Sequence, residues 1–373
     1  YAGDDIFVPV SSVNNLRRSA IEMLKGEILK RYRRVSAADD RDKKRGCVAR
    51  KGSLGFARDD IKMTGDDIKM TGDDINKGRV VGNVIEKGNG ANESILIHCR
   101  IDKPEMLDDI LEYDFVDIVS MDISEFTGMK QSEAGPVFRY RELRETAEMI
   151  SGSRKSFYLI LPTVIRDGYF ERQRELDELL RSGIADGVII DNYESLYYLK
   201  SIGYKGEILS DIHLYAFNDE ACAKLAEYGV SMITCPVELN ERELKRLDMK
   251  RGEFIIYGRL PMMISAGCTA LTLNGCKADK GASIITDRLG NDFPVIRNCR
   301  ECINTILNCV PMMFSPGKIP EMAGIASYRI HFTTEDRDQI RRIMGYYSEA
   351  LRGMEPGMPD IKYTHGHYKR GVE

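Results

Sequence analysis

"KSFYLILPTV" (residues 155–164) and "ADGVIIDN" (residues 185–192) flank the helix-like stretch "RQRELDELLRSG" (residues 172–183), and this unit decides the fold. Both flanking runs are short and apolar, as strands are when their two faces are buried. The middle stretch has apolar residues at helical spacing and ends at Gly183, which tolerates the left-handed backbone of a helix cap. The sequence therefore predicts a strand, a helix and a second, parallel strand.

The same alternation continues on both sides of this unit. Two later helical runs also end at a glycine, Gly203 and Gly229. About seven strands that alternate with helices indicate a parallel sheet, which we expect to close into a TIM-like (β/α) barrel. A doubly wound open sheet is the alternative, although no G-x-G-x-x-G follows the first strand. The other strand-like runs are "SILIHCRI" (94–101), "VDIVSMDI" (116–123), "GEILSDIHLYAFN" (206–218), "VSMITCPVEL" (230–239) and "GEFIIYGRLPMM" (252–263).

The pattern divides the chain into four predicted parts. Residues 1–50 hold an amphipathic helix and a basic connector, and residues 51–90 form a low-complexity linker with the heptad repeat "DDIKMTG". We expect no chemistry from this linker. The barrel is predicted over residues 91–266, and a cysteine-containing C-terminal region over 267–373. The basic connector is interpreted as a solvated segment, with an arm that contacts RNA phosphates as the alternative.

The composition excludes few classes of function. The 373 residues are 43% hydrophobic and 30% charged, with a formal net charge of −4, which neither requires nor excludes a nucleic-acid partner. No apolar run approaches the roughly 18 residues of a membrane span, and no N-terminal series has the pattern of a signal peptide. We therefore expect a cytoplasmic protein without a membrane partner. Because the chain opens at Tyr1 rather than Met, we also expect it to be part of a longer protein.

Polar residues end the predicted strands, at the edge where barrel enzymes place functional side chains. Such residues also cap the helices that follow, and for any single one of them capping is the simpler interpretation. Together they predict one polar mouth, with Asp191, Asp211, His213 and Arg259 as the residues that line the substrate. The full set is Arg100, Asp122, Asp191, Asn192, Asp211, His213, Glu238 and Arg259.

Cysteines gather after the predicted barrel. Five of nine lie between residues 268 and 309. The spacing Cys268-x7-Cys276-x22-Cys299-x2-Cys302 predicts a four-thiolate site, because cysteine sulfur binds zinc and iron–sulfur clusters. The spacing does not choose the metal, and unligated, partly buried thiols are the alternative. Of the five remaining thiols, four are expected in the core, at Cys99, Cys222, Cys235 and Cys309, and the fifth is Cys47 in the basic connector.

Several stretches carry a family resemblance. "GEFIIYGRLPMMISAGC" (252–268) resembles the signature of the U32 peptidase family, the collagenase-like proteins, with Glu253, Gly258 and Cys268 in register. Pro261 stands where that signature has its first cysteine, and Cys276 is the substitute ligand that the chemistry suggests. Other stretches resemble the large variant with a domain called DUF3656 and a second barrel, so the resemblance implies that an N-terminal barrel half is absent here. These are "DDIFVPVSSVNNLRRSAIEML" (4–24), "DRLGNDFPV" (287–295), "CRECINTILNCVP" (299–311) and the T-x-G-H-like "YTHGHYKRGVE" (363–373).

The resemblance implies competing functions. Relatives hold a four-cysteine 4Fe-4S cluster and hydroxylate pyrimidines in tRNA or ribosomal RNA, or quinone precursors, without O₂. We expect the RNA reaction here, with zinc as the alternative metal. The family name implies a peptidase instead, but neither H-E-x-x-H nor G-x-S-x-G occurs. A non-catalytic barrel that scaffolds the missing half or another partner protein is the third reading. The residues implied are Cys268, Cys276, Cys299 and Cys302 for the cluster and Asp191, Asp211, His213, Glu253 and Arg259 for catalysis.

The closing stretch admits three interpretations. "THGHYKRGVE" combines His365, His367, Lys369 and Arg370 with Tyr368, and Tyr363 precedes it. Aromatic rings stack on bases and cations meet phosphates, so this tail is either an RNA-contacting element or a structural clasp over the barrel. His365 as a metal ligand is the third alternative.

Overall fold

The computed structural model describes Met23 and residues 95–127, 138–166, 169–170, 174–249, 251–269, 271, 281–299, 301–315 and 325–369. The predicted heptad linker, the basic connector and, apart from Met23, the N-terminal amphipathic helix lie outside these residues. Cys276 lies outside them as well. The account below concerns the part of the chain from residue 95 onward.

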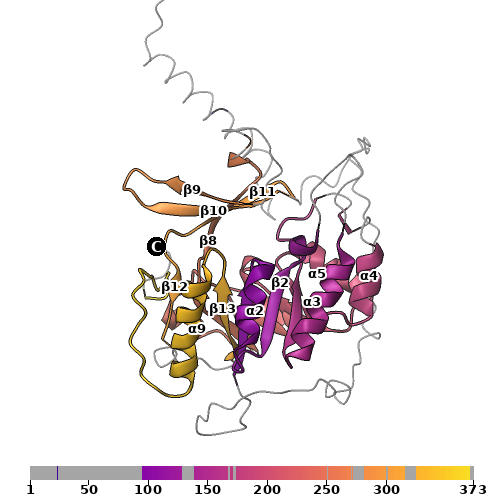
Figure 1. Cartoon of the computed structure of the whole chain (residues 1–373). Coiled ribbons are helices and arrows are strands. Elements are labelled where there is room, and N and C mark those ends of the chain that lie inside the picture. The colour runs from indigo at the N-terminus through magenta and orange to yellow at the C-terminus, as the bar shows by residue number, and fades with distance from the viewer. Residues whose placement is uncertain are drawn as a thin grey trace, which may run out of the picture. The chain divides into compact units, whose positions relative to one another are not determined.

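Eight parallel strands in this part of the chain close into a barrel (Figure 1). The closure is made by β6 and β7, which pair in parallel at Ile233–Gly252 and Thr234–Glu253. The prediction of a TIM-like (β/α) barrel is confirmed, and the open-sheet alternative is excluded by this pairing. In spatial order the strands are β1 (Leu96–Ile101), β2 (Ile118–Asp122), β3 (Ser156–Ile160), β4 (Gly187–Ile190), β5 (Glu207–Ser210), β6 (Met232–Thr234), β7 (Gly252–Gly258) and β13 (Ile325–Phe332).

The eighth strand comes from far along the chain. β13 lies between β7 and β1, parallel to both, although it follows β7 by more than sixty residues. The range predicted for the barrel, residues 91–266, therefore does not include β13, a strand that the closed barrel requires. Helix α9 (Arg337–Leu351) follows β13 and packs against the barrel with buried Ile343, Met344 and Tyr347.

Helices cover the outside of the barrel, and their boundaries follow local capping chemistry. Asn192 caps α5 (Tyr193–Ser201) through the Ser195 amide, and Asp336 and Gln339 form a capping box on α9. The predicted glycine ends of three helices have left-handed backbones, with φ of 76°, 68° and 87° at Gly183, Gly203 and Gly229. The other helices are α2 (Leu107–Leu111), α3 (Tyr140–Gly152), α4 (Arg174–Arg181), α6 (Asp219–Glu227) and α7 (Glu241–Leu244), with short 3₁₀ turns η1 (Pro104–Met106), η2 (Ile123–Phe126) and η4 (Ile212–Leu214).

The interior of the barrel changes from apolar to charged along its axis. Because side chains alternate along a strand, every second residue of each strand points inward. The lower layer is a small apolar cluster of Ile118, Tyr158, Ile160, Ile189, Leu209 and Met232. Nearer the carboxyl ends the inward positions are polar, beginning with His98, Ser120 and Glu253. The larger apolar core lies between the strands and the helices, which leaves the upper interior free for polar groups.

A second, antiparallel sheet is inserted between β7 and β13. Its strand order is β8-β11-β10-β9, formed by Pro261–Ser265, Ile303–Leu307, Asp292–Asn298 and Ala282–Thr286. The chain then returns through β12 (Met312–Met313), which pairs antiparallel with β7. Figure 1 shows this small sheet at the end of the barrel where the strands have their carboxyl ends.

Among the described helices, none combines the length and the apolar character that a crossing of a bilayer demands.

Gly187 on β4 provides a test of the closed interior. A Cβ at this position would lie 2.6 Å from Cζ of Tyr158, whose ring fills the barrel beside it. We expect Gly187→Ala to lower the free energy of unfolding by about 1–3 kcal/mol, because the ring has to leave its place in the packed interior. Urea unfolding measures this.

Gly345→Ala is the matched control, since a Cβ there meets nothing within 4 Å and the residue lies inside α9. It should leave stability unchanged or raise it by about 0.5–1 kcal/mol. Equal midpoints for the Gly187→Ala variant and the unmodified chain would contradict the packing described here.

Candidate functional site

Arg329 on β13 joins the two carboxylates at the centre of the barrel. Its side chain is buried, Nε donates to Glu253 Oε1 at 2.6 Å, and one terminal nitrogen donates to Asp211 Oδ1 at 2.7 Å. The other terminal nitrogen donates to Thr234 Oγ1 at 2.7 Å and also contacts Glu253. The guanidinium therefore has partners on three strands, which is the condition for keeping a charge away from water.

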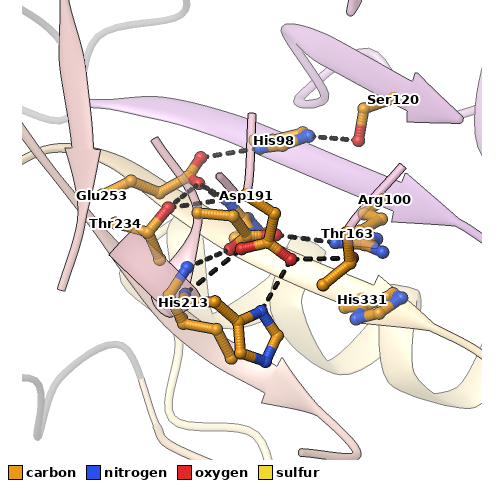
Figure 2. Close-up of polar contacts among 12 residues, drawn as sticks. His98, Arg100, Ser120, Thr163, Asp191, His213, Thr234, Glu253 and His331 are labelled. Atoms are coloured by element: carbon orange, nitrogen blue, oxygen red, sulfur yellow. Dashed lines mark hydrogen bonds and ion pairs between the residues drawn. The ribbon is translucent and has the colours of Figure 1, made fainter. Parts of the chain in front are cut away.

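His98 completes the buried end of this network. Its Nδ1 lies 2.6 Å from Glu253 Oε2 and its Nε2 lies 2.6 Å from Ser120 Oγ (Figure 2). Burial lowers the pKa of His98, so the ring is neutral, donates from Nδ1 to the carboxylate and accepts the Ser120 hydroxyl at Nε2. Burial also opposes ionisation of Glu253, but Arg329 and His98 outweigh it and hold the pKa of this carboxyl at about 2.

Arg100 carries the network upward to the mouth. It donates to Asp211 Oδ2 at 2.8 Å and lies 3.6 Å from Asp102, whose carboxylate accepts from His331 Nε2 at 2.9 Å. Arg329 and Arg100 outweigh the effect of burial on Asp211 and hold the pKa of its carboxyl below the usual range. The two arginines and the carboxylates of Asp211 and Glu253 thus balance in charge, and the upper interior is a fixed ionic framework.

His213 and Asp191 form a separate pair beside this framework. Asp191, at the carboxyl end of β4, accepts from His213 Nδ1 at 2.6 Å, from the His213 amide at 3.2 Å and from Thr163 Oγ1 at 2.8 Å (Figure 2). Burial lowers the pKa of His213, but the hydrogen bond and charge of Asp191 outweigh it and raise the pKa above its ordinary value. Nε2 of His213 has no hydrogen-bond partner among the described residues, so the ring can take or give a proton there.

A cavity of about 160 Å³ lies between the barrel mouth and the small sheet. Of the five residues predicted to be catalytic, Asp191, Asp211, His213 and Arg259 line it, and Glu253 does not, because it is buried beneath them. Arg100 and Asp122 line it as well. The small sheet contributes residues such as Ile264, Arg297, Asn298 and Cys299, so the mouth is covered rather than open.

Capping and site roles coincide at several strand ends. Asp211 caps η4 through the Ile212 amide and also holds both arginines. Asn192 is a cap alone: it accepts from Ser195 N and donates to Pro162 O and Thr163 O, which fixes the loop after β3. Neither Asn192 nor Glu238 lines the cavity.

Arg259 braces the exit of the chain from the barrel into the small sheet. Its guanidinium donates to Asn308 O at 3.0 Å, to Cys309 O at 2.6 Å and to Thr334 Oγ1 at 3.2 Å. The preceding Gly258 has φ of 148°, and a Cβ there would lie 2.9 Å from Cβ of His331. The glycine of the family-like stretch is therefore required by the close approach of β13.

Three of the four predicted cysteine ligands, Cys268, Cys299 and Cys302, lie at one end of the small sheet. Cys268 follows β8, Cys299 follows β10 and Cys302 precedes β11, while Ser265 pairs with Asn304 in the β8–β11 ladder. Asn304 Nδ2 also donates to the Gly267 carbonyl at 3.0 Å, next to Cys268. Cys299 lines the cavity.

The chemistry of these donors suits zinc or an iron–sulfur cluster, but the described residues contain no group of three ligating side chains arranged around a metal. Cys276, the fourth predicted ligand, lies outside the described residues, so the ligand set stays a prediction. Cys99, Cys222 and Cys235 are buried in the apolar core, as expected.

The C-terminal tail packs as a clasp. Thr364 O accepts from the Met313 amide at 3.0 Å, and Tyr368 O accepts from the Glu241 amide at 2.8 Å. The Tyr368 ring is buried against Phe254 and Phe314 at 6.0 and 5.2 Å between ring centroids. These contacts support the structural reading of the tail rather than an RNA-facing one.

Sequence reasoning named Arg100 but missed three further polar residues of the interior, His98, Arg329 and His331. His98 and Arg100 on β1 lie beside Arg329 and His331 on β13 in register, His98 opposite Arg329 and Arg100 opposite His331. The signal was present as two strands, "IHCRI" and "YRIHF", in which polar residues alternate with apolar ones. It was hidden because β13 is separated from the other barrel strands by the inserted sheet.

Replacement of Arg329 tests the ionic framework. We expect Arg329→Met to lower the free energy of unfolding by about 3–5 kcal/mol, because Glu253 and Asp211 would remain as buried, uncompensated charges. Chemical unfolding measures this, and Lys245→Met, which removes only the exposed pair with Glu241, should change stability by less than about 1 kcal/mol. A variant at position 329 as stable as the unmodified chain would show that the framework is not needed for folding.

Two comparisons with known proteins gave a match. The model of the family described as peptidase family U32 matches residues 128–368, more than half of the chain. A solved structure, that of the U32 peptidase Mk0906, is similar with a TM-score of 0.42 and 11% identity, over 67% of this chain and 98% of that one. No curated protein matches. Neither comparison addresses DUF3656, which stays a prediction from the sequence. The match over most of the barrel, the inserted sheet and the clasp shows that this chain belongs to peptidase family U32.

Proposed function

We propose that this chain is an RNA-modifying member of the U32 family that hydroxylates a pyrimidine base without O₂, in the covered cavity above the barrel. One observation carries the proposal: the His213–Asp191 pair, in which Asp191 raises the pKa of His213, lines a small cavity between the barrel mouth and the inserted sheet. A covered site that holds one proton-transferring side chain among fixed charges is suited to a small planar group rather than to an extended polymer.

The ionic framework supports recognition of such a group. Arg100 and Asp211 line the cavity with donors and acceptors whose positions are held by Arg329 and Asp102. Donors and acceptors of this kind read the hydrogen-bonding edges of an unpaired base. Because their own ion pairs fix them, they do not have to reorganise when the base arrives.

His213 moves the proton in this proposal. With Nδ1 held by Asp191, the neutral ring accepts a proton at Nε2 from the reacting group, and Asp191 stabilises the imidazolium that results. Hydroxylation also needs an oxygen-atom donor other than O₂ that is itself reduced by two electrons, and a 4Fe-4S cluster on the predicted cysteines would relay those electrons. The roles of His213, Asp191 and Arg100 do not depend on that cluster.

A peptidase is the second candidate. It is favoured by the presence of Ser124 and Cys299 in the same cavity as the His213–Asp191 pair. Nucleophilic catalysis requires a hydroxyl or thiol in hydrogen-bond reach of the base, and in the described structure His213 Nε2 has no such contact. The RNA reaction is therefore the stronger proposal.

Substitution of His213 tests the proposal. We expect His213→Gln to lower the rate of hydroxylation by a factor of about 10²–10⁴, with unchanged thermal stability. The content of the hydroxylated pyrimidine in cellular RNA should fall as a result. Nucleoside mass spectrometry of RNA from cells that carry each variant measures it, with the exposed Glu220→Gln as control. Hydrolysis of casein that disappears with His213→Gln, in cells whose RNA is unaltered, would establish the peptidase instead.

The pH dependence tests the role of Asp191. Because a base must be neutral, the rate should rise with pH through the raised pKa of His213. Asp191→Asn removes the charge that favours the imidazolium, so the pKa of His213 falls and the rising limb should move to lower pH. An unmoved limb would mean that His213 is not the group that titrates.

Metal analysis tests the predicted ligand set. After anaerobic purification we expect iron and acid-labile sulfide in the unmodified chain, and their loss in Cys268→Ala and Cys276→Ala. Cys222→Ala is the control, since Cys222 is a buried core thiol on α6. Iron and sulfide that persist in both ligand variants would remove the assignment, and zinc without sulfide would make the site structural.

A further inference from the structure

The loop after β5 presents two aromatic rings outward beside the cavity. In "LYAF" (residues 214–217) burial alternates: Leu214 and Ala216 are buried, while Tyr215 is 52% and Phe217 39% exposed. The buried pair ties the loop to the core. The two rings lie 5.5 Å apart between centroids, so they form one exposed aromatic surface.

Tyr215 holds this position against its own backbone preference. Its φ is 50° and its ψ 53°, a left-handed conformation that is a genuine outlier for a bulky residue. Both ends of the loop are anchored, by Asp211 on the Ile212 amide and by Asn218 on the Ala221 amide. An exposed ring in a strained backbone contributes little to stability, so its presence requires another explanation.

The Tyr215 ring lies next to the proposed reaction centre. Its centroid is 6.3 Å from that of His213, and the two rings are nearly perpendicular at 84°. His213 lines the cavity and Tyr215 does not, so the Tyr215 ring lies next to a cavity residue rather than in the cavity wall.

We propose that Tyr215, supported by Phe217, is the stacking surface for an unpaired base of single-stranded RNA beside the cavity. The proposal rests on the RNA-modifying function above, and it assigns the nucleobase contact to one loop. Base–aromatic stacking tolerates any base, because every base has a π face, and it needs an exposed, immobile ring. The strained and anchored loop supplies such a ring.

The binding test uses the full chain and a fluorescein-labelled, uridine-rich RNA 12-mer, followed by anisotropy. We expect Tyr215→Ala to weaken binding about 5- to 150-fold, the range that corresponds to loss of one stacked base, and Tyr215→Phe to retain it. Tyr197→Ala is the control, since Tyr197 is a more exposed tyrosine that lies on α5, the helix after β4, and not in the loop that contacts His213. It should bind as the unmodified chain does.

Tyr215→Gly separates binding from folding. Glycine adopts the left-handed conformation without strain, so this variant should melt no lower than the unmodified chain while binding RNA as weakly as Tyr215→Ala. Retained RNA binding by Tyr215→Ala would overturn the stacking role and leave the proposed function standing. Absence of RNA binding by the unmodified chain, with casein binding that depends on Tyr215, would overturn both.

Discussion

The ion pairs of Arg329 with Glu253 and Asp211 are the constraint on which the upper barrel depends. The Arg329 side chain is only 1% exposed, and a guanidinium buried so deeply is stable only when each of its N–H donors has an acceptor. Those acceptors lie on β5, β6 and β7, so the pairs fix how β13 sits between its neighbours. They also hold Asp211 ionised and in contact with Arg100, and Arg100 extends the network of ion pairs to the mouth.

The charged and titratable residues at the barrel mouth fall into two groups. The framework of Arg329, Arg100, Asp211 and Glu253 is held by ion pairs among its own members, whereas the His213–Asp191 pair lines the cavity and has no hydrogen-bond partner at Nε2 of His213 among the described residues. A rigid set of charges beside a single titratable group is a common way to tune proton transfer, because the charges set the pKa without moving. The inserted sheet adds the cover that limits access of water.

The inserted sheet also explains why the cysteines occur where they do. Three of them lie in the turns at one end of β8, β10 and β11, and Cys299 reaches the cavity. The clasp of Thr364 and Tyr368 packs near the return strand β12, and so stabilises the connection between the inserted sheet and the barrel.

The sequence by itself determined the class of fold and much of the mouth. Short apolar strands with glycine-ended helices between them specify a (β/α) barrel, and strand-end residues such as Asp191, Asp211 and His213 must then share one edge. Only the tertiary structure decided that the eighth strand is Ile325–Phe332, that Arg329 and not a mouth residue is the partner of Glu253, and that Tyr215 stands exposed beside His213. The physical reason is that local patterns report the period and burial of a segment, while the pairing of distant strands depends on contacts that no local pattern contains.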